Sequence, residues 1–168
     1  IVGSLIYLST TVRPDITTIV NHAARGLSKP TMFHVCLLDY LLVYLYHTRN
    51  YGLRYTHSDS MVITEILHPL TRKYGELGAL RNTPYVLFSD ASVGDLHDSR
   101  LRSTTGWCCY VYGCLVSWYS RRQSITAKST LEAELLAAAT CSDEGCWLHQ
   151  LAESMPYIFK LPPNSKPP

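Results

Sequence analysis

The chain has 168 residues, 46% of them hydrophobic and 17% charged, and its formal net charge is +2. This composition is typical of a globular protein and excludes a largely disordered chain. No apolar run reaches the roughly 20 residues that a bilayer-spanning helix needs, so we expect no membrane partner, and the small net charge neither requires nor excludes nucleic acid.

The amino-terminal part of the chain has the spacing of helices. The chain begins with Ile1 rather than Met, inside an apolar run, so we expect a fragment of a longer polypeptide. Pro14 favours a helix start, and apolar residues at helical spacing predict a helix over 14–27. A second helix, apolar nearly all round, is predicted over 31–48. The short stretch 52–55 has a strand-like pattern.

Two stretches show no regular pattern. Residues 57–83 contain Pro69, Gly75 and Gly78, are followed by Pro84, and are predicted to form a linker. Residues 157–168 form a proline-rich tail with little that could fold by itself. We therefore divide the chain into a helical segment at 1–56, the linker, an α/β unit at 84–156, and the tail.

Three strand-like runs follow the linker, at 85–89, 105–112 and 114–120. Gly113 predicts a tight hairpin between the last two runs. A long helix is predicted after them, over 130–155. Three strands followed by a helix indicate the start of an α/β layer.

The cysteines and tryptophans are interpreted as structural residues. The six cysteines lack the paired spacing of a zinc site, so we expect reduced, mostly buried thiols. We expect Trp107, Trp118 and Trp147 on the core faces of strands and helix rather than stacked on bases.

The start of the long helix contains two glutamates with different predicted roles. Ser129 followed by Glu132 fits a capping box, in which the hydroxyl and the carboxylate bond backbone N–H groups of the first turn. Glu134 lies three positions after Leu131 and four before Ala138, so it borders the apolar face of the helix. A carboxylate there is either solvated or recruited to a site, because burying it unpaired is costly.

A second carboxylate, that of Asp90, closes the first predicted strand. If the long helix packs across the sheet, Glu134 can approach Asp90. Two converging carboxylates make a hard, oxygen-lined site suited to Mg²⁺ or Mn²⁺. Two such ions about 4 Å apart can activate a water and stabilise the leaving oxygen in phosphodiester cleavage.

Four motifs follow one another in the second half of the chain: Phe88-Ser-Asp-Ala-Ser, Arg102-Ser-Thr-Thr-Gly-Trp107, Val116-Ser-Trp-Tyr-Ser-Arg-Arg-Gln123 and Ser129-Thr-Leu-Glu-Ala-Glu-Leu-Leu-Ala137. In this order they resemble the ribonuclease H domain of Ty1/copia-type retrotransposon polyproteins. Shorter upstream matches resemble the region that joins the reverse transcriptase thumb to that domain: Val2-Gly-Ser-Leu-Ile-Tyr-Leu-Ser, Arg13-Pro-Asp-Ile, Ser28-Lys-Pro-Thr, His34 and Tyr51-Gly-Leu. The order and spacing of the motifs make the resemblance specific.

The resemblance implies an RNase H-like fold that hydrolyses the RNA strand of an RNA–DNA hybrid, using four acidic residues and two Mg²⁺ or Mn²⁺ ions. Asp90 matches the first of these residues and Glu134 the second, whereas Glu132 matches a family glutamate outside the metal-binding set. The implied partners are the rest of the polyprotein, namely the reverse transcriptase palm and the carboxyl-terminal half of the RNase H domain. The implied location is intracellular, in a cytoplasmic particle or the nucleus.

The chain departs from the family pattern after the long helix, where a fourth strand ending in an aspartate and a further acidic residue are expected. None of Asp95, Asp98 and Asp143 takes these places. We therefore predict a truncated RNase H-like α/β fold, three antiparallel strands and then a helix, preceded by a helical thumb/connection segment. Half a ligand set predicts little or no nuclease activity from this chain alone. The alternative is a non-catalytic remnant, or a co-opted module that binds nucleic acid or protein.

The turn before the long helix is basic. We predict that Arg121, Arg122 and Lys128 contact a nucleic-acid backbone, with Ser129 and Thr130 as donors at the helix start. The alternative is a solvated turn between strand and helix.

Overall fold

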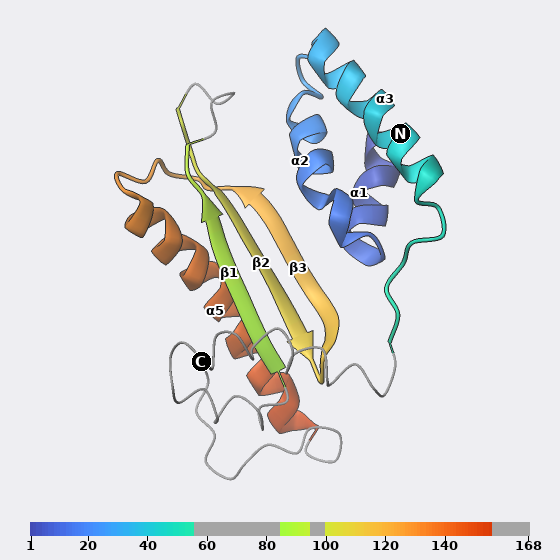
Figure 1. Cartoon of the computed structure of the whole chain (residues 1–168). Helices are drawn as coiled ribbons and strands as arrows, with labels where there is room; N and C mark the ends of the chain where they lie inside the picture. The colour runs from blue at the N-terminus through green and yellow to red at the C-terminus, as the bar shows by residue number, and fades with distance from the viewer. Residues whose placement is uncertain (56–84, 95–99, 156–168) are drawn as a thin grey trace, which may run out of the picture. The chain divides into compact units, whose positions relative to one another are not determined.

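The computed structural model describes residues 1–55, 85–94 and 100–155. They fall into two compact units, one made of Ile1–Arg54 with the short stretch Tyr119–Arg121, the other holding the rest of the sheet and the long helix. The expected mixed α/β class is confirmed, with a three-stranded antiparallel sheet (Figure 1). The predicted linker at 57–83, the tail at 157–168, and Asp95 and Asp98 lie outside the described residues.

The first unit, here called the helical unit, consists of α1 (Val2–Thr11), η1 (Pro14–Ile16), α2 (Thr17–Arg25) and α3 (Met32–His47). The helices predicted over 14–27 and 31–48 are confirmed. The first consists of the 3₁₀ turn η1, which continues into α2, and the second is α3. The strand predicted at 52–55 is wrong, because no described strand pairs with this stretch. Among the helices of the described residues, none has the length and apolar character that a membrane crossing needs.

Large aliphatic side chains form the core of the helical unit. Ile16 and Leu41 are fully buried, and they cluster with Leu5 and Val20. Since α1, η1, α2 and α3 each contribute one of these four side chains, burial of apolar area holds the helices together.

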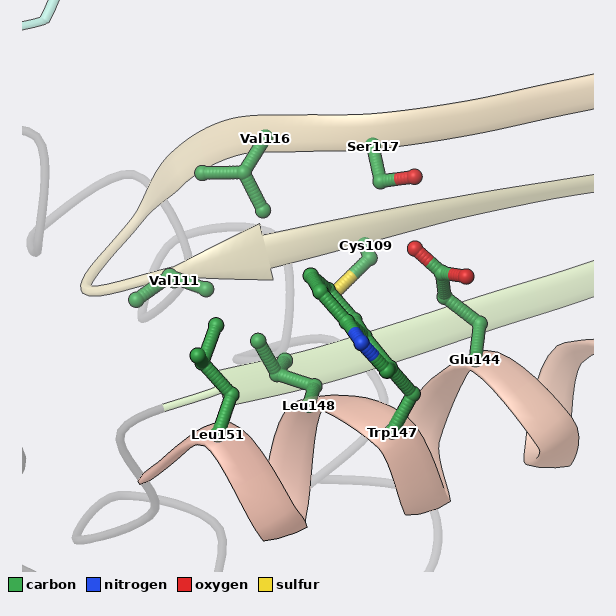
Figure 2. Close-up of a pocket in the computed structure, with 8 residues that line it drawn as sticks. All are labelled: Cys109, Val111, Val116, Ser117, Glu144, Trp147, Leu148 and Leu151. Carbon is green, nitrogen blue, oxygen red and sulfur yellow. The ribbon is translucent and has the colours of Figure 1, made fainter. Parts of the chain in front are cut away.

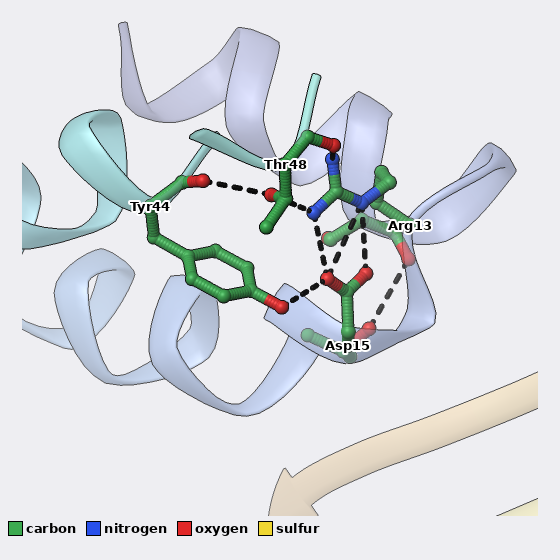
Figure 3. A network of polar contacts seen from close by, with 6 residues as sticks. Arg13, Asp15, Tyr44 and Thr48 are labelled. Atoms are coloured by element: carbon green, nitrogen blue, oxygen red, sulfur yellow. Dashed lines mark hydrogen bonds and ion pairs between the residues drawn. The ribbon is translucent and has the colours of Figure 1, made fainter. Parts of the chain in front are cut away.

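A polar network joins the start of η1 to the end of α3 (Figure 3). Arg13 is buried and donates to both carboxylate oxygens of Asp15, from Nε to Oδ1 at 2.9 Å and from Nη2 to Oδ2 at 2.7 Å. The same guanidinium donates to the carbonyl oxygen of Thr48 at 3.1 Å and to its Oγ1 at 2.7 Å. The Tyr44 hydroxyl donates to Asp15 Oδ2 at 2.9 Å. These bonds and the positive charge of Arg13 lower the pKa of Asp15.

The sheet has the order β1–β2–β3, with strands at Tyr85–Ser92, Thr104–Val111 and Cys114–Arg122. The hairpin predicted at Gly113 is confirmed. Tyr112 and Gly113 both have positive φ angles, 47° and 86°, as a tight two-residue turn requires. β1 pairs antiparallel with β2, and Asp90 lies opposite Gly106.

The long helix α5 (Thr130–Ser154) confirms the prediction over 130–155 and covers one face of the sheet at β1 and β2 (Figure 1). Near the start of α5 its contact with β1 consists of small side chains, because Ala133 and Ala137 are fully buried against Ala91. Small residues let a helix and a strand approach closely, but each buries little apolar area.

Candidate functional site

Asp90 lies on β1 with an exposed side chain. The strand extends to Ser92, three residues further than its apolar pattern predicts, so Asp90 is inside the strand and not at its end. Its neighbour Ala91 packs against α5. Because consecutive side chains of a strand point to opposite faces, Asp90 projects from the face that α5 does not cover.

Glu134 lies in the second turn of α5 with a half-buried side chain. The helix start is capped much as predicted. Ser129 Oγ accepts a hydrogen bond from the Glu132 N–H at 3.1 Å. The Glu132 carboxylate accepts from the N–H of Lys128 at 2.6 Å, one residue before the position predicted. The structure therefore uses Glu132 at the helix start, as predicted.

The two flanks of α5 face different parts of the sheet. One flank, with Glu144, Trp147 and Leu151, faces β2 and β3 (Figure 2). By the helical repeat, Glu134 lies about 100° around the helix axis from Leu151. His149 lies further round the helix, and its Nδ1 lies 2.8 Å from the Tyr85 hydroxyl of β1.

Asp90 and Glu134 each adjoin a residue of one packed contact. Ala91 follows Asp90, Ala133 precedes Glu134, and these two alanines lie in one cluster with Ala137. The approach of the two carboxylates to one another stays a prediction.

The donor chemistry of this pair fits Mg²⁺ or Mn²⁺ in kind, since carboxylate oxygens are the ligands these ions prefer. It does not fit in number. Within residues 1–55, 85–94 and 100–155, no group of three or more His, Cys, Asp or Glu side chains could hold a metal ion. The metal-binding roles of Asp90 and Glu134 therefore stay predictions.

Gln123, which sequence reasoning did not single out, is buried beside this contact with a side chain that is 8% exposed. Its Nε2 donates to Thr105 Oγ1 at 3.1 Å and to the Ala133 carbonyl oxygen at 2.9 Å. A glutamine between a strand and a helix is ordinarily expected on the surface, so only the position of Gln123 at the end of a resemblance motif could have drawn attention to it.

A pocket of about 300 Å³ lies on the other flank of α5, and none of the predicted site residues lines it: its lining consists of Cys109, Val111, Val116, Ser117, Glu144, Trp147, Leu148 and Leu151 (Figure 2). The expectation that Trp147 lies on a core face is wrong, because this side chain is 55% exposed at the pocket. The physical reason is that α5 covers β1 and β2 and leaves the flank toward β3 open.

All six cysteines are free thiols, two of them buried and Cys36 exposed. Burial raises the pKa of Cys109, in the pocket wall, to about 12. This thiol is therefore protonated at neutral pH and a poor nucleophile.

The predicted backbone-contacting residues lie around the turn that enters α5. Arg121, Lys128, Ser129 and Thr130 are exposed, and Arg122 is half-buried. Ser129 also supplies the helix cap, so its hydroxyl already has one structural role. Contact of these residues with a nucleic-acid backbone stays a prediction.

Comparison with known proteins shows several relatives at about 30% identity. The chain is 31% identical over 148 residues to the secreted RxLR effector protein 161 of Plasmopara viticola, covering 88% of this chain and 87% of that protein. It is 31% identical over 164 residues to the retrovirus-related Pol polyprotein from transposon RE1 of Arabidopsis thaliana, covering 97% of this chain. It is 30% identical over 154 residues to the Pol polyprotein from transposon TNT 1-94 of Nicotiana tabacum, covering 92% of this chain.

The chain spans 10% of the length of each of these two Pol polyproteins. No family model matches the chain, and no solved structure matches it. The Pol relatives cover nearly the whole chain and agree with the resemblance seen in its motifs. The chain belongs to the family of Ty1/copia-type retrotransposon Pol polyproteins, as a polyprotein fragment.

Proposed function

We propose that this chain is the part of a retrotransposon polyprotein that joins the reverse transcriptase to its ribonuclease H domain and supplies two of the acidic residues of the nuclease. The helical unit is the thumb/connection segment, and β1 to α5 begin an RNase H-like fold. The substrate of the complete domain is an RNA–DNA hybrid, whose RNA strand is hydrolysed. The chain alone supplies Asp90 and Glu134 and is inactive.

The observation that carries this proposal is the alanine contact between β1 and α5. Ala91 and Ala133 are the immediate neighbours of Asp90 and Glu134, and both are buried in that contact. A contact made of larger side chains would hold the strand and the helix further apart. Close approach is what two carboxylates need if they are to share one metal ion.

Each residue has a distinct role in the proposed site. Asp90, from the exposed face of β1, and Glu134, from α5, would each provide oxygen ligands to Mg²⁺. Bound divalent ions would activate the attacking water and stabilise the leaving oxygen. Glu132 is not a ligand, because its carboxylate accepts the Lys128 N–H. Arg121 and Lys128 would contact the phosphate backbone, which positions a hybrid without reading its sequence.

The test is Mg²⁺-dependent cleavage of an RNA–DNA hybrid labelled on its RNA strand. One reaction contains the chain alone, and a second also contains the polypeptide that follows the matched region in the transposon RE1 polyprotein. We expect no cleavage in the first reaction and cleavage in the second.

Substitutions then assign the cleavage to residues. Asp90→Asn and Glu134→Gln should each reduce it to the background seen without Mg²⁺, whereas the matched variant Glu132→Gln should retain it. Cleavage that survives both Asp90→Asn and Glu134→Gln would refute the proposed site, and so would the absence of cleavage in the second reaction.

A second candidate function is favoured by the Plasmopara viticola relative. This chain covers 87% of that protein, which is named a secreted effector and not a Pol polyprotein. By analogy, the chain would be a non-catalytic module that binds nucleic acid or protein. Binding of the hybrid, measured by fluorescence anisotropy, without cleavage in either reaction would favour this second function.

A further inference from the structure

We infer that Gln123 is a positioning residue that holds the Glu134 turn of α5 against the sheet, next to Asp90. This inference rests on the proposed function for its purpose, but its geometry stands on contacts of the described residues. It assigns to Gln123 no contact with metal or substrate.

The side-chain amide of Gln123 joins two elements. Its Nε2 donates to Thr105 Oγ1 on β2 at 3.1 Å and to the Ala133 carbonyl oxygen on α5 at 2.9 Å. Both N–H groups of the amide are therefore used. The backbone of Gln123 is itself fixed, because its N–H donates to the Ser103 carbonyl oxygen at 2.8 Å.

The two acceptors lie next to the predicted carboxylates. Thr105 is the β2 residue directly opposite Ala91, which follows Asp90. Ala133 directly precedes Glu134 in α5. One amide thus connects the strand position beside Asp90 to the helical turn of Glu134.

This connection matters because the apolar contact at the same place is small. The cluster between β1 and α5 consists of Ala91, Ala133 and Ala137, with Ala127 packed against it. Methyl groups bury little apolar area. They also interlock too little to fix the rotation of a helix about its axis or its distance from the sheet. Hydrogen bonds are directional, so the Gln123 amide can fix what the alanines do not.

Stability alone does not explain an amide at this position. Gln123 Oε1 is buried and has no hydrogen-bond partner in the described part of the chain. An unsatisfied buried acceptor is destabilising, and methionine has a similar length and no such atom. Methionine lacks the two N–H donors of the Gln123 amide. We assign the positioning role to these donors.

The experiment compares Gln123→Met with the unsubstituted full chain, using Gln150→Met as a matched control because Gln150 is an exposed glutamine of α5. Amide hydrogen exchange is followed by NMR. In Gln123→Met, we expect the amides of residues 134–138 to exchange about tenfold faster, as loss of one or two hydrogen bonds predicts. The amides of residues 142–146 of α5 should be unchanged, and Gln150→Met should change neither set.

A Mn²⁺ titration of the same samples supplies the second readout. Broadening of the Glu134 amide signal should need about tenfold more Mn²⁺ in Gln123→Met, the loss typical of residues that orient a metal ligand. Gln123→Glu keeps the side-chain shape but has no donor when ionised, so it should behave like Gln123→Met.

The outcomes separate the two proposals. Unchanged exchange at 134–138 in Gln123→Met would overturn the positioning role whatever the metal does. Wild-type behaviour of Gln123→Glu in both readouts would also overturn it, since the donors would then be unnecessary. If Mn²⁺ broadens neither Asp90 nor Glu134 in the unsubstituted chain, the proposed function fails, and the positioning of a metal ligand fails with it.

Discussion

The helical unit and the second unit, here called the sheet unit because it holds most of the sheet and α5, hold their helices by different means. The helical unit has a core of large aliphatic side chains: Leu5, Ile16, Val20 and Leu41. In the sheet unit, the start of α5 meets β1 through three alanines: Ala91, Ala133 and Ala137. The comparison contrasts an interface held by apolar volume with one for which we infer that the directed hydrogen bonds of Gln123 hold the helix in place. The alanine interface buries less apolar area than larger side chains would. It lets β1, which carries Asp90, and α5, which carries Glu134, approach closely.

Leu41→Ala should have the largest effect. It removes a fully buried side chain and should lower the unfolding free energy of the helical unit by about 2–5 kcal/mol. The three tryptophans lie at 107, 118 and 147, and residues 1–54 contain none. In urea titrations, part of the helical circular-dichroism signal should be lost at lower urea concentrations than in the unsubstituted chain. The urea midpoint of tryptophan fluorescence should stay unchanged.

The neighbouring substitution Leu42→Ala is the control, since Leu42 is 43% exposed and should cost less than about 1 kcal/mol. Equal effects of Leu41→Ala and Leu42→Ala would mean that aliphatic volume does not hold the helical unit.

Arg13→Met tests the polar network of the helical unit. It keeps much of the aliphatic stem but removes the bonds to Asp15 and Thr48, and we expect a loss of about 2–3 kcal/mol. Arg49→Met is the control, because Arg49 is exposed and its guanidinium lies over the Tyr46 ring at 5.1 Å. That pair should contribute less than about 1 kcal/mol. Urea unfolding followed by circular dichroism measures both variants.

Ala137→Leu tests the close approach in the sheet unit. Inserting a larger side chain into the alanine contact should cost about 1–3 kcal/mol. It should also move α5 away from β1, and thus Glu134 away from Asp90. Ala139→Leu on the exposed side of the same helix is the control. Tryptophan fluorescence in urea reports the stability, and a Mn²⁺ titration reports the site; full tolerance of Ala137→Leu in both would count against a close alanine contact.

The smallest effect concerns pH. The Arg13 guanidinium lowers the pKa of Asp15 below its unfolded value, so ionised Asp15 stabilises the helical unit. This contribution is present above the unfolded pKa of about 3.9 and is lost as pH falls through the lower folded pKa. Asp15 is partly exposed, so solvent screening keeps the effect small. Asp15→Asn should flatten the dependence of the urea midpoint on pH between about 5 and 2, whereas the exposed control Asp39→Asn should not.

Local patterns predicted most of the elements. α3 has a long, nearly continuous apolar run, α5 has a predicted cap, and the β2–β3 turn is set by Gly113, so these depend little on distant residues. The end of β1 could not be predicted, because Asp90 to Ser92 lack strand-like alternation and are extended by pairing with Thr104 to Gly106 of β2.

For the candidate site, the sequence predicts two residues, Asp90 and Glu134, and their roles stay predictions. The position of Asp90 inside β1 could not be predicted, because it depends on pairing with β2. The burial of Gln123 depends on Thr105 and Ala133, which belong to two other elements. The exposure of Trp147 likewise depends on which strands α5 covers, a property of tertiary packing.

The most direct test of the central claim is whether Asp90 and Glu134 bind one ion together. Mn²⁺ is titrated into the isotopically labelled chain, and the broadening of both amide signals is compared with that of Asp39, an exposed aspartate of the helical unit. Both signals should broaden at Mn²⁺ concentrations that leave Asp39 sharp. Asp90→Asn alone, and Glu134→Gln alone, should each abolish the broadening at both positions, because the two ligands are coupled. Loss of broadening only at the substituted residue, or equal broadening of Asp39, would contradict a shared metal site.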